Sequence, residues 1–166
     1  MATAYLNPDG ASSIAGWNTS FSTTASHLSR NDTSNEWRTT FNNTAKVLFT
    51  LDDFDFSGLN VSSITNIKHR LVIGYDARGG SANAEVQIQN AGGASLYAET
   101  HANTAGAGFQ TFDGTARTTS DGSSAWTDSD LDGLKLFLTC TGGGFAVHIV
   151  QQLYLEVTYA ESVSGY

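Results

Sequence analysis

The last third of the chain alternates apolar and polar residues through two long segments, and this pattern limits the fold more than any other feature. A period of two is typical of strands with one buried face. In the first segment the apolar face carries Leu134, Leu136, Leu138 and Cys140. In the second it carries Phe145, Val147, Ile149, Leu153, Leu155, Val157 and Tyr159. The sequence therefore predicts a long antiparallel hairpin over residues 126–159, which turns at residues 142–144 and forms the centre of the core.

One polar pair interrupts the apolar face of the second segment. Gln151 falls where an apolar residue is expected, and Gln152 follows it. The whole segment is also longer than an average strand. Both observations predict a β-bulge or a bend at this pair, where the strand changes its packing partner.

Weaker strand patterns cover much of the remaining chain. Residues 45–51 and 64–75 alternate clearly, and His69 shares the inward parity of the second segment. Residues 64–101 together are interpreted as a three-stranded meander, and residues 109–112 as one further strand. Residues 126–133 predict a helical turn capped by Thr127 or Asp128. With at least eight strands and almost no helix, the expected fold is all-β: an antiparallel β-sandwich, jelly-roll-like, with a long C-terminal hairpin.

Length and charge exclude several classes of protein. A chain of 166 residues fits one domain over residues 1–166, in which residues 1–44 are expected to form a loosely packed N-terminal segment. The net charge of −8 has the wrong sign for binding nucleic acid or an anionic membrane. The first ten residues lack the basic and apolar regions of a secretory signal, and no stretch has the roughly 20 apolar residues of a membrane span.

The sequence contains no recognisable catalytic or metal-binding motif. Residues 128–133 begin like an EF-hand loop, but the twelfth position is Thr139 where calcium requires a glutamate, so a capped turn is the simpler interpretation. The four histidines lack the spacing of a zinc site, and Cys140 in an apolar strand is expected to be a buried, inert thiol. Asp52 and Asp53 are adjacent and would point to opposite faces of a strand. The prediction is a non-enzymatic protein without cofactor or metal.

One group of residues suggests binding instead. The outer face of the predicted hairpin carries Phe137, His148, Val150 and Tyr154, which is more apolar than a solvated sheet face requires. These residues are candidates for contact with another subunit. The alternative is that the N-terminal segment of the same chain covers them.

Several framework motifs resemble sequences of tailed-phage virion proteins. They are Leu-Asn-Pro-Asp at 6–9 followed by Trp17, Asp-Phe-Asp-Phe-Ser-Gly-Leu at 53–59, the strand at 64–72, Trp-Thr-Asp-Ser-Asp-Leu-Asp-Gly-Leu at 126–134, and Leu-Glu-Val-Thr-Tyr at 155–159. The resemblance covers most of the chain, but many such sequences have an aspartate where this chain has Gln151 or Gln152. It implies a β-sandwich virion protein, such as a capsid decoration (cement) protein or a tail or neck component.

Two functions follow as expectations. In the first, the protein decorates a phage head, contacts the major capsid protein and its own copies, and forms a homo-oligomer, by analogy a trimer. It would then reside in the virion after assembly in the host cytoplasm. In the alternative, it is a carbohydrate-binding sandwich of a tail fibre or other receptor-binding assembly, with Trp17, Trp37 or Trp126 as a stacking platform. Tryptophans in a sandwich more often fill the core, and that is the other interpretation of these three residues.

Overall fold

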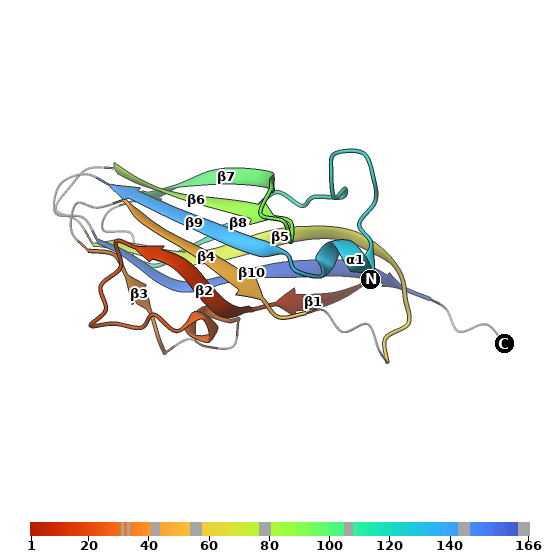
Figure 1. Ribbon diagram of the computed structural model, residues 1–166, viewed down its shortest axis with the longest axis horizontal. Helices are drawn as coiled ribbons and strands as arrows, with labels where there is room; N and C mark the ends of the chain where they lie inside the picture. Colours follow the sequence, from red (N-terminus) through yellow and green to blue (C-terminus); the bar gives the residue numbers. More distant parts are fainter. Residues whose placement is uncertain are drawn as a thin grey trace.

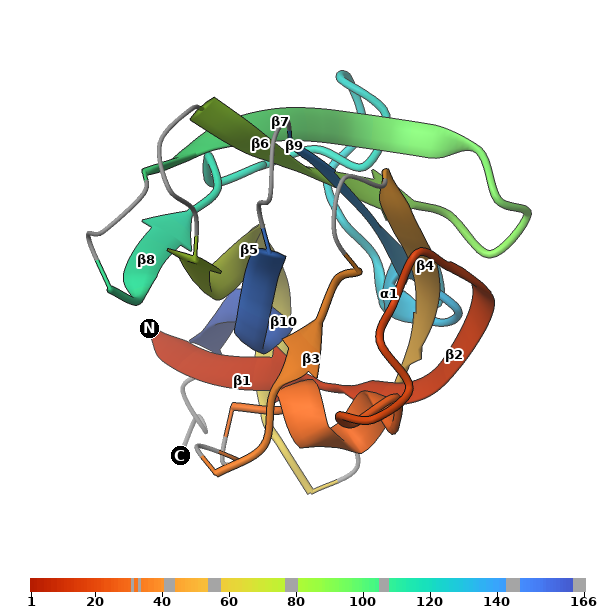
Figure 2. The same cartoon turned by 90° about the vertical axis from the view of Figure 1, so that its left-hand side faces the viewer.

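Two antiparallel β-sheets packed face to face form the molecule (Figures 1 and 2). The computed structural model describes residues 1–30, 32, 34–40, 44–53, 58–76, 81–104, 108–142 and 147–162. The first sheet has the order β1-β10-β5-β8, with β3 paired to β10, and the second has the order β2-β4-β9-β6-β7. The bounds are β1 Ala2–Leu6, β2 Pro8–Ala15, β3 Trp37–Arg38, β4 Ala45–Leu51, β5 Val61–Asp76, β6 Ser81–Gln89, β7 Ser95–Thr104, β8 Gln110–Asp113, β9 Lys135–Gly142 and β10 Val147–Glu161. The prediction of an antiparallel β-sandwich with at least eight strands is confirmed.

The strands of the predicted C-terminal hairpin do not pair with each other. β9 lies between β4 and β6, whereas β10 lies between β1 and β5 in the opposite sheet. The apolar face of β9, with Leu136 and Leu138, and that of β10, with Leu155 and Val157, are both fully buried in one core. The hairpin prediction was wrong because alternation shows that a strand buries one face, but not which neighbour it bonds.

The same physical reason overturns the predicted meander. β5 belongs to the first sheet and β6 to the second, so only β6 and β7 form a true hairpin. Its turn lies at residues 90–94, and Gly93 adopts a φ of +86°, which favours glycine. The inward residues of β4 and β5 are those that the alternation predicts.

The bulge predicted in the last strand is present, and it reverses the strand's two faces. Val150 pairs with Ile73 and Gln152 pairs with Val72, so Gln151 is the extra residue. Before the bulge the buried residues are His148 and Val150; after it they include Leu153, Leu155, Val157 and Tyr159. The predicted inward positions of Val147 and Ile149 are therefore wrong, because one inserted residue moves every earlier side chain to the other face.

This reversal also corrects the predicted contact surface. Of its four residues, His148, Val150 and Tyr154 are buried within the chain, and Phe137 is half-buried in β9 of the other sheet. Thr39 Oγ1 accepts a hydrogen bond of 2.9 Å from the His148 amide, and the Tyr5 ring packs edge-on against Tyr154 at 5.7 Å between centroids. His148 and Val150 thus face the core, and the N-terminal segment covers Tyr154 through Tyr5, the alternative that the sequence left open.

The described part of the N-terminal segment is anchored in the core. Leu28 and Trp37 are fully buried, and the Trp37 ring packs edge-on against Trp17 and Phe49 at 5.4 and 5.2 Å. These residues fix the segment to the core at several points. Aromatic rings of this size contribute much of the apolar area that holds such a segment in place.

The predicted helical turn is α1, Asp128–Leu131, and the carboxylate of Asp130 bonds to the backbone at its start. Thr127 caps it: its Oγ1 accepts from the Asp130 amide, and the Asp130 side chain accepts from the Thr127 amide. Among the described residues no group of three or more His, Cys, Asp or Glu side chains is placed to hold a metal ion. Within the same ranges no helix has the length and apolar character needed to span a bilayer. Residues 143–144 of the predicted turn, Phe145 of the predicted second strand and residues 54–57 of the motif at 53–59 lie outside the described ranges.

Candidate functional site

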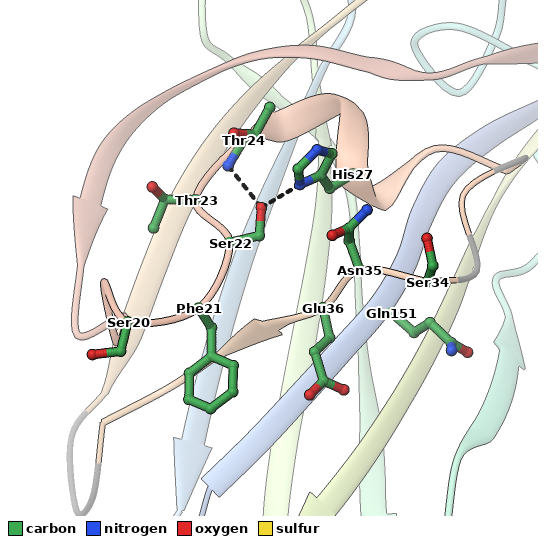
Figure 3. Close-up of a pocket in the computed structure, with 10 residues that line it drawn as sticks. All are labelled: Ser20, Phe21, Ser22, Thr23, Thr24, His27, Ser34, Asn35, Glu36 and Gln151. Atoms are coloured by element: carbon green, nitrogen blue, oxygen red, sulfur yellow. Dashed lines mark hydrogen bonds between the residues drawn. The ribbon is translucent and has the colours of Figure 1, made fainter.

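A polar cleft lies beside the bulge of β10, between two segments that lead into and out of a single 3-10 turn, η1 (Ala25–Leu28). Its volume is about 710 Å³. Most of its lining consists of hydroxyl and amide side chains, with one aromatic ring (Figure 3). The lining residues are Ser20, Phe21, Ser22, Thr23, Thr24, His27, Ser34, Asn35, Glu36 and Gln151.

The floor of this cleft is fixed by the core beneath it. Leu28 is fully buried below η1, and the Trp37 indole donates a 3.0 Å hydrogen bond to the carbonyl of Thr24. Trp37 also pairs with Val150, next to the bulge. The side of the cleft formed by residues 20–24 is therefore held by the Trp37 indole, and Trp37 is in turn held by the first residues of β10.

The bulge of β10 holds the opposite side of the cleft, which is formed by residues 34–36. Gln152 donates from Nε2 to the carbonyls of Arg30 and Asp32, at 2.8 and 3.3 Å, while Gln151 lines the cleft itself. The Asp32 carboxylate accepts from the amides of Ser34 and Asn35 and from the Asn35 side chain. The Asn35 side-chain bond makes the largest contribution to a lowered Asp32 pKa. The extra residue that reverses β10 thus also brings an amide to the cleft.

The aromatic side chain of the cleft is held from one side. Phe21 is 39 % exposed, and the Arg38 guanidinium carbon lies 4.3 Å from its ring centroid. Arg38 is itself fixed by Glu36, because Nε and Nη2 donate to Oε1 at 2.9 and 2.6 Å. Figure 3 shows the Phe21 ring and the Glu36 carboxylate pointing to the same side. One ring face is therefore occupied by a cation, and the ring keeps a substantial exposed area.

Ser22 and His27 form a close contact in the same cleft. Ser22 Oγ lies 2.6 Å from His27 Nδ1, and it also accepts a 3.1 Å hydrogen bond from the Thr24 amide (Figure 3). A serine beside a histidine is the beginning of a nucleophile pair. Here, however, the hydroxyl accepts from the backbone two residues on, which is the role of a serine that stabilises a turn.

Charge in the cleft is low. Among its lining residues the charged or titratable side chains are Glu36 and His27, and none is Lys or Arg. The Glu36 charge is paired with Arg38, whose side chain is 32 % exposed. A ligand in this cleft therefore meets hydrogen-bonding groups and one aromatic ring rather than an unbalanced charge.

The tryptophans expected to form a stacking platform are buried. Trp17, Trp37 and Trp126 are 6, 0 and 4 % exposed, and their indole nitrogens donate to the carbonyls of Lys46, Thr24 and Arg117. That prediction was wrong, because a large ring in a sandwich contributes most by filling the core. Sequence reasoning missed Phe21, whose signal is a single aromatic residue within a run of serine and threonine.

Comparisons with known proteins find no matching family model and no match among curated proteins. Solved structures with a similar arrangement include an arabinose-bound GH51 α-L-arabinofuranosidase (TM-score 0.49, 16 % identity, 93 % of this chain and 26 % of the other). They also include the xylan-binding module CBM15 (0.47, 10 %, 96 % and 92 %) and the enzymatically active domain of tailspike protein 4 from bacteriophage CBA120 (0.46, 7 %, 95 % and 19 %). The chain thus spans about a quarter of the arabinofuranosidase.

Proposed function

We propose that the chain is a non-catalytic carbohydrate-binding β-sandwich module whose site is the cleft beside η1. The observation that carries the proposal is the half-exposed Phe21 ring, backed by Arg38, beside a cleft lined with hydroxyl and amide groups. A sugar ring has an apolar C–H face and a rim of hydroxyl groups. The cleft offers a matching surface for each.

The polar lining suits hydroxyl groups that both donate and accept. Serine and threonine hydroxyls and the amides of Asn35 and Gln151 can do both. The second oxygen of Glu36, Oε2, has no hydrogen-bond partner among the described residues, since Arg38 uses Oε1. Such a carboxylate oxygen is a strong acceptor for a sugar hydroxyl.

The charge of the site favours a neutral glycan. An acidic sugar would bring an anion to a cleft without lysine or arginine in its lining, on a protein of net charge −8. Like charge on both partners weakens the encounter. Neutral hexose or pentose units avoid this cost.

The proposal places the module in a receptor-binding assembly of a phage particle; the motif resemblance implies a virion protein, and the position in that assembly is part of this proposal. The decoration role expected from the same motifs has no comparable support, because most of its predicted contact residues are buried by the chain itself. Binding to the host's surface glycans would need no catalytic group.

A glycan array with the purified chain and its Phe21→Ala variant tests the proposal. The expected result is binding of neutral glycans by the native chain and loss of that signal in the variant. Phe109→Ala is a matched control, since Phe109 is also half-exposed, at 48 %, and lies outside the cleft lining. An array without signal for the native chain, or equal losses in both variants, would contradict the proposal.

A further inference from the structure

Two histidines from opposite sheets, neither of which lines the cleft, meet between the two sheets of the sandwich. His69 lies on β5 and His101 on β7, and their Nε2 atoms are 2.7 Å apart. Figure 2 shows these strands in different layers. His69 is 1 % exposed. The contact is therefore a direct polar link between the sheets in a mostly apolar core.

Neighbouring atoms leave the two rings little room to turn away. The His101 ring stacks on Phe112 at 4.9 Å with an interplanar angle of 19°. Gly114 lies against His69: a Cβ at this position would collide with the His69 ring, and the Gly114 amide donates to the His69 carbonyl at 2.9 Å. The rings consequently keep their facing nitrogens as long as β5 and β7 stay together.

Charged side chains surround the pair from every adjoining element. Glu99 of β7 is the nearest, with Oε2 3.9 Å from His69 Nδ1, and it also accepts from the Thr115 amide and hydroxyl. Arg117 Nη2 lies 3.8 Å from the same Glu99 oxygen. The further charged groups are Lys68 and Arg70 of β5, Asp113 of β8 and Glu156 of β10, which pair among themselves.

This geometry admits one proton between the two nitrogens. At 2.7 Å one Nε2–H donates to the lone pair of the other Nε2. The arrangement in which His101 donates places the His69 proton on Nδ1, toward Glu99. If both Nε2 atoms carry protons, two donors face each other without an acceptor, and two positive charges meet in a poorly solvated space.

We propose that His69 and His101 form an acid-sensitive clasp. It holds β5 and β7 together while the two rings share one hydrogen bond. When both rings are protonated, it releases the side of the sandwich where β7, at the end of one sheet, meets β8, at the end of the other. The consequence is a protein that changes its own edge in an acidic compartment or medium. This device is independent of the sugar cleft and of the function proposed for it.

The pKa values of both histidines are lowered in the closed sandwich, which is the direction that the clasp requires. Burial, with a smaller contribution from His101, lowers the pKa of His69 to about 4, and burial also lowers the pKa of His101. In an opened edge each imidazole returns toward its ordinary pKa of about 6.5. Opening therefore takes up as many as two protons as the pH falls from about 6.5 toward 4, so each pH unit favours it by up to about a hundredfold.

Native-state hydrogen exchange at pH 6.5 and pH 5, corrected for intrinsic rates, tests the clasp. This window lies above the ordinary carboxylate pKa values, so lowered pKa values of Glu99 and Asp113 contribute little within it. The expected result is that β7 and β8 amides lose protection by at least about tenfold while β4 amides keep theirs. Equal changes in all three strands would overturn the proposal.

The variant His101→Gln separates the pair from other causes, because its amide keeps a polar contact without a charge. It should remove the difference between pH 6.5 and pH 5 in β7, whereas His27→Gln, at a histidine outside the pair, should leave that difference intact. If His101→Gln does not fold, the imidazole nitrogen resonances of the native chain decide. Independent titration of His69 and His101 near pH 6.5 in an intact fold would show that there is no clasp.

Discussion

Arg38 covers one face of the Phe21 ring, with its guanidinium carbon 4.3 Å from the ring centroid. Glu36 fixes that guanidinium through two hydrogen bonds. The arrangement orients an aromatic side chain that would otherwise be free at the surface. It is the structural basis for proposing a stacking site in a segment made mostly of serine and threonine.

Changing the ring should change affinity in a graded way. Phe21→Ala removes the apolar surface and is expected to weaken binding of a neutral oligosaccharide by about tenfold, or about 1.4 kcal/mol. Phe21→Trp keeps an aromatic face and should retain binding. Isothermal titration calorimetry of the three proteins measures both effects, and unchanged affinity in Phe21→Ala would show that the ring is not the platform.

Ligand binding should depend little on salt. Because the Glu36 charge is paired with Arg38 and the cleft lining holds no lysine or arginine, a neutral ligand gains nothing from long-range charge. The dissociation constant is expected to stay the same between low and high sodium chloride. A steep salt dependence would indicate an ionic ligand and would argue against the neutral-glycan class.

Loss of the Gln152 side chain should loosen the cleft wall. Gln152→Ala removes two hydrogen bonds to the carbonyls of Arg30 and Asp32, which is expected to reduce stability by about 1 kcal/mol. Glycan affinity should also fall, because the wall that carries Asn35 and Glu36 loses its anchor. Chemical denaturation measures the change in stability, and calorimetry on the same preparation measures the change in glycan affinity. A Gln152→Ala variant with native stability and native affinity would contradict the anchoring role of Gln152.

The cap of α1 provides a test unrelated to ligand binding. Thr127→Ala removes the hydroxyl that accepts from the Asp130 amide, and the expected loss of stability is about 1 kcal/mol. Thr127→Ser should restore most of it, since a serine hydroxyl caps equally well. Urea denaturation of both variants distinguishes a capping role from simple loss of packing. If only packing is lost, serine would not restore the free energy of unfolding.

Stability should fall as the solution becomes acidic. The folded pKa of His69, about 4, lies below its ordinary value, so the unfolded chain binds more protons between pH 6.5 and 4. The contribution of His69 to the free energy of unfolding is therefore complete above pH 6.5 and is lost through this window, a decrease on the order of 3 kcal/mol. Burial of His148, which lowers its pKa, acts in the same direction. Urea titrations at several pH values check the slope; a flat profile would contradict it.

The sequence predicted the fold class because alternation in β4, β5 and β9 reports burial directly. It did not predict how the strands are distributed between sheets, because β9 and β10 both bury one face whether they pair with each other or face each other across the core. The bulge at Gln151 was predictable from its break in the apolar face. The pattern alone does not show whether such a break inserts a residue and reverses the faces, so His148 and Val150 were predicted on the wrong face.

The candidate site was largely hidden from sequence reasoning. Its residues come from positions 20–27, which lead into η1, from positions 34–36 before β3, and from Gln151 in the bulge of β10, which lies more than a hundred positions further along the chain. Only the folded chain brings Phe21 and Gln151 to one cleft. The tryptophans were the wrong candidates because apolar area drives the largest rings into the core, which leaves a smaller aromatic residue at the surface.

The most direct measurement is a two-dimensional amide NMR titration of the isotope-labelled chain with neutral oligosaccharides taken from the array. The account predicts saturable shifts confined to residues 20–27, 34–38 and Gln151, and their loss in Phe21→Ala but not in Phe109→Ala. Saturable shifts centred elsewhere on the sandwich, or shifts in the cleft that persist in Phe21→Ala, would contradict it.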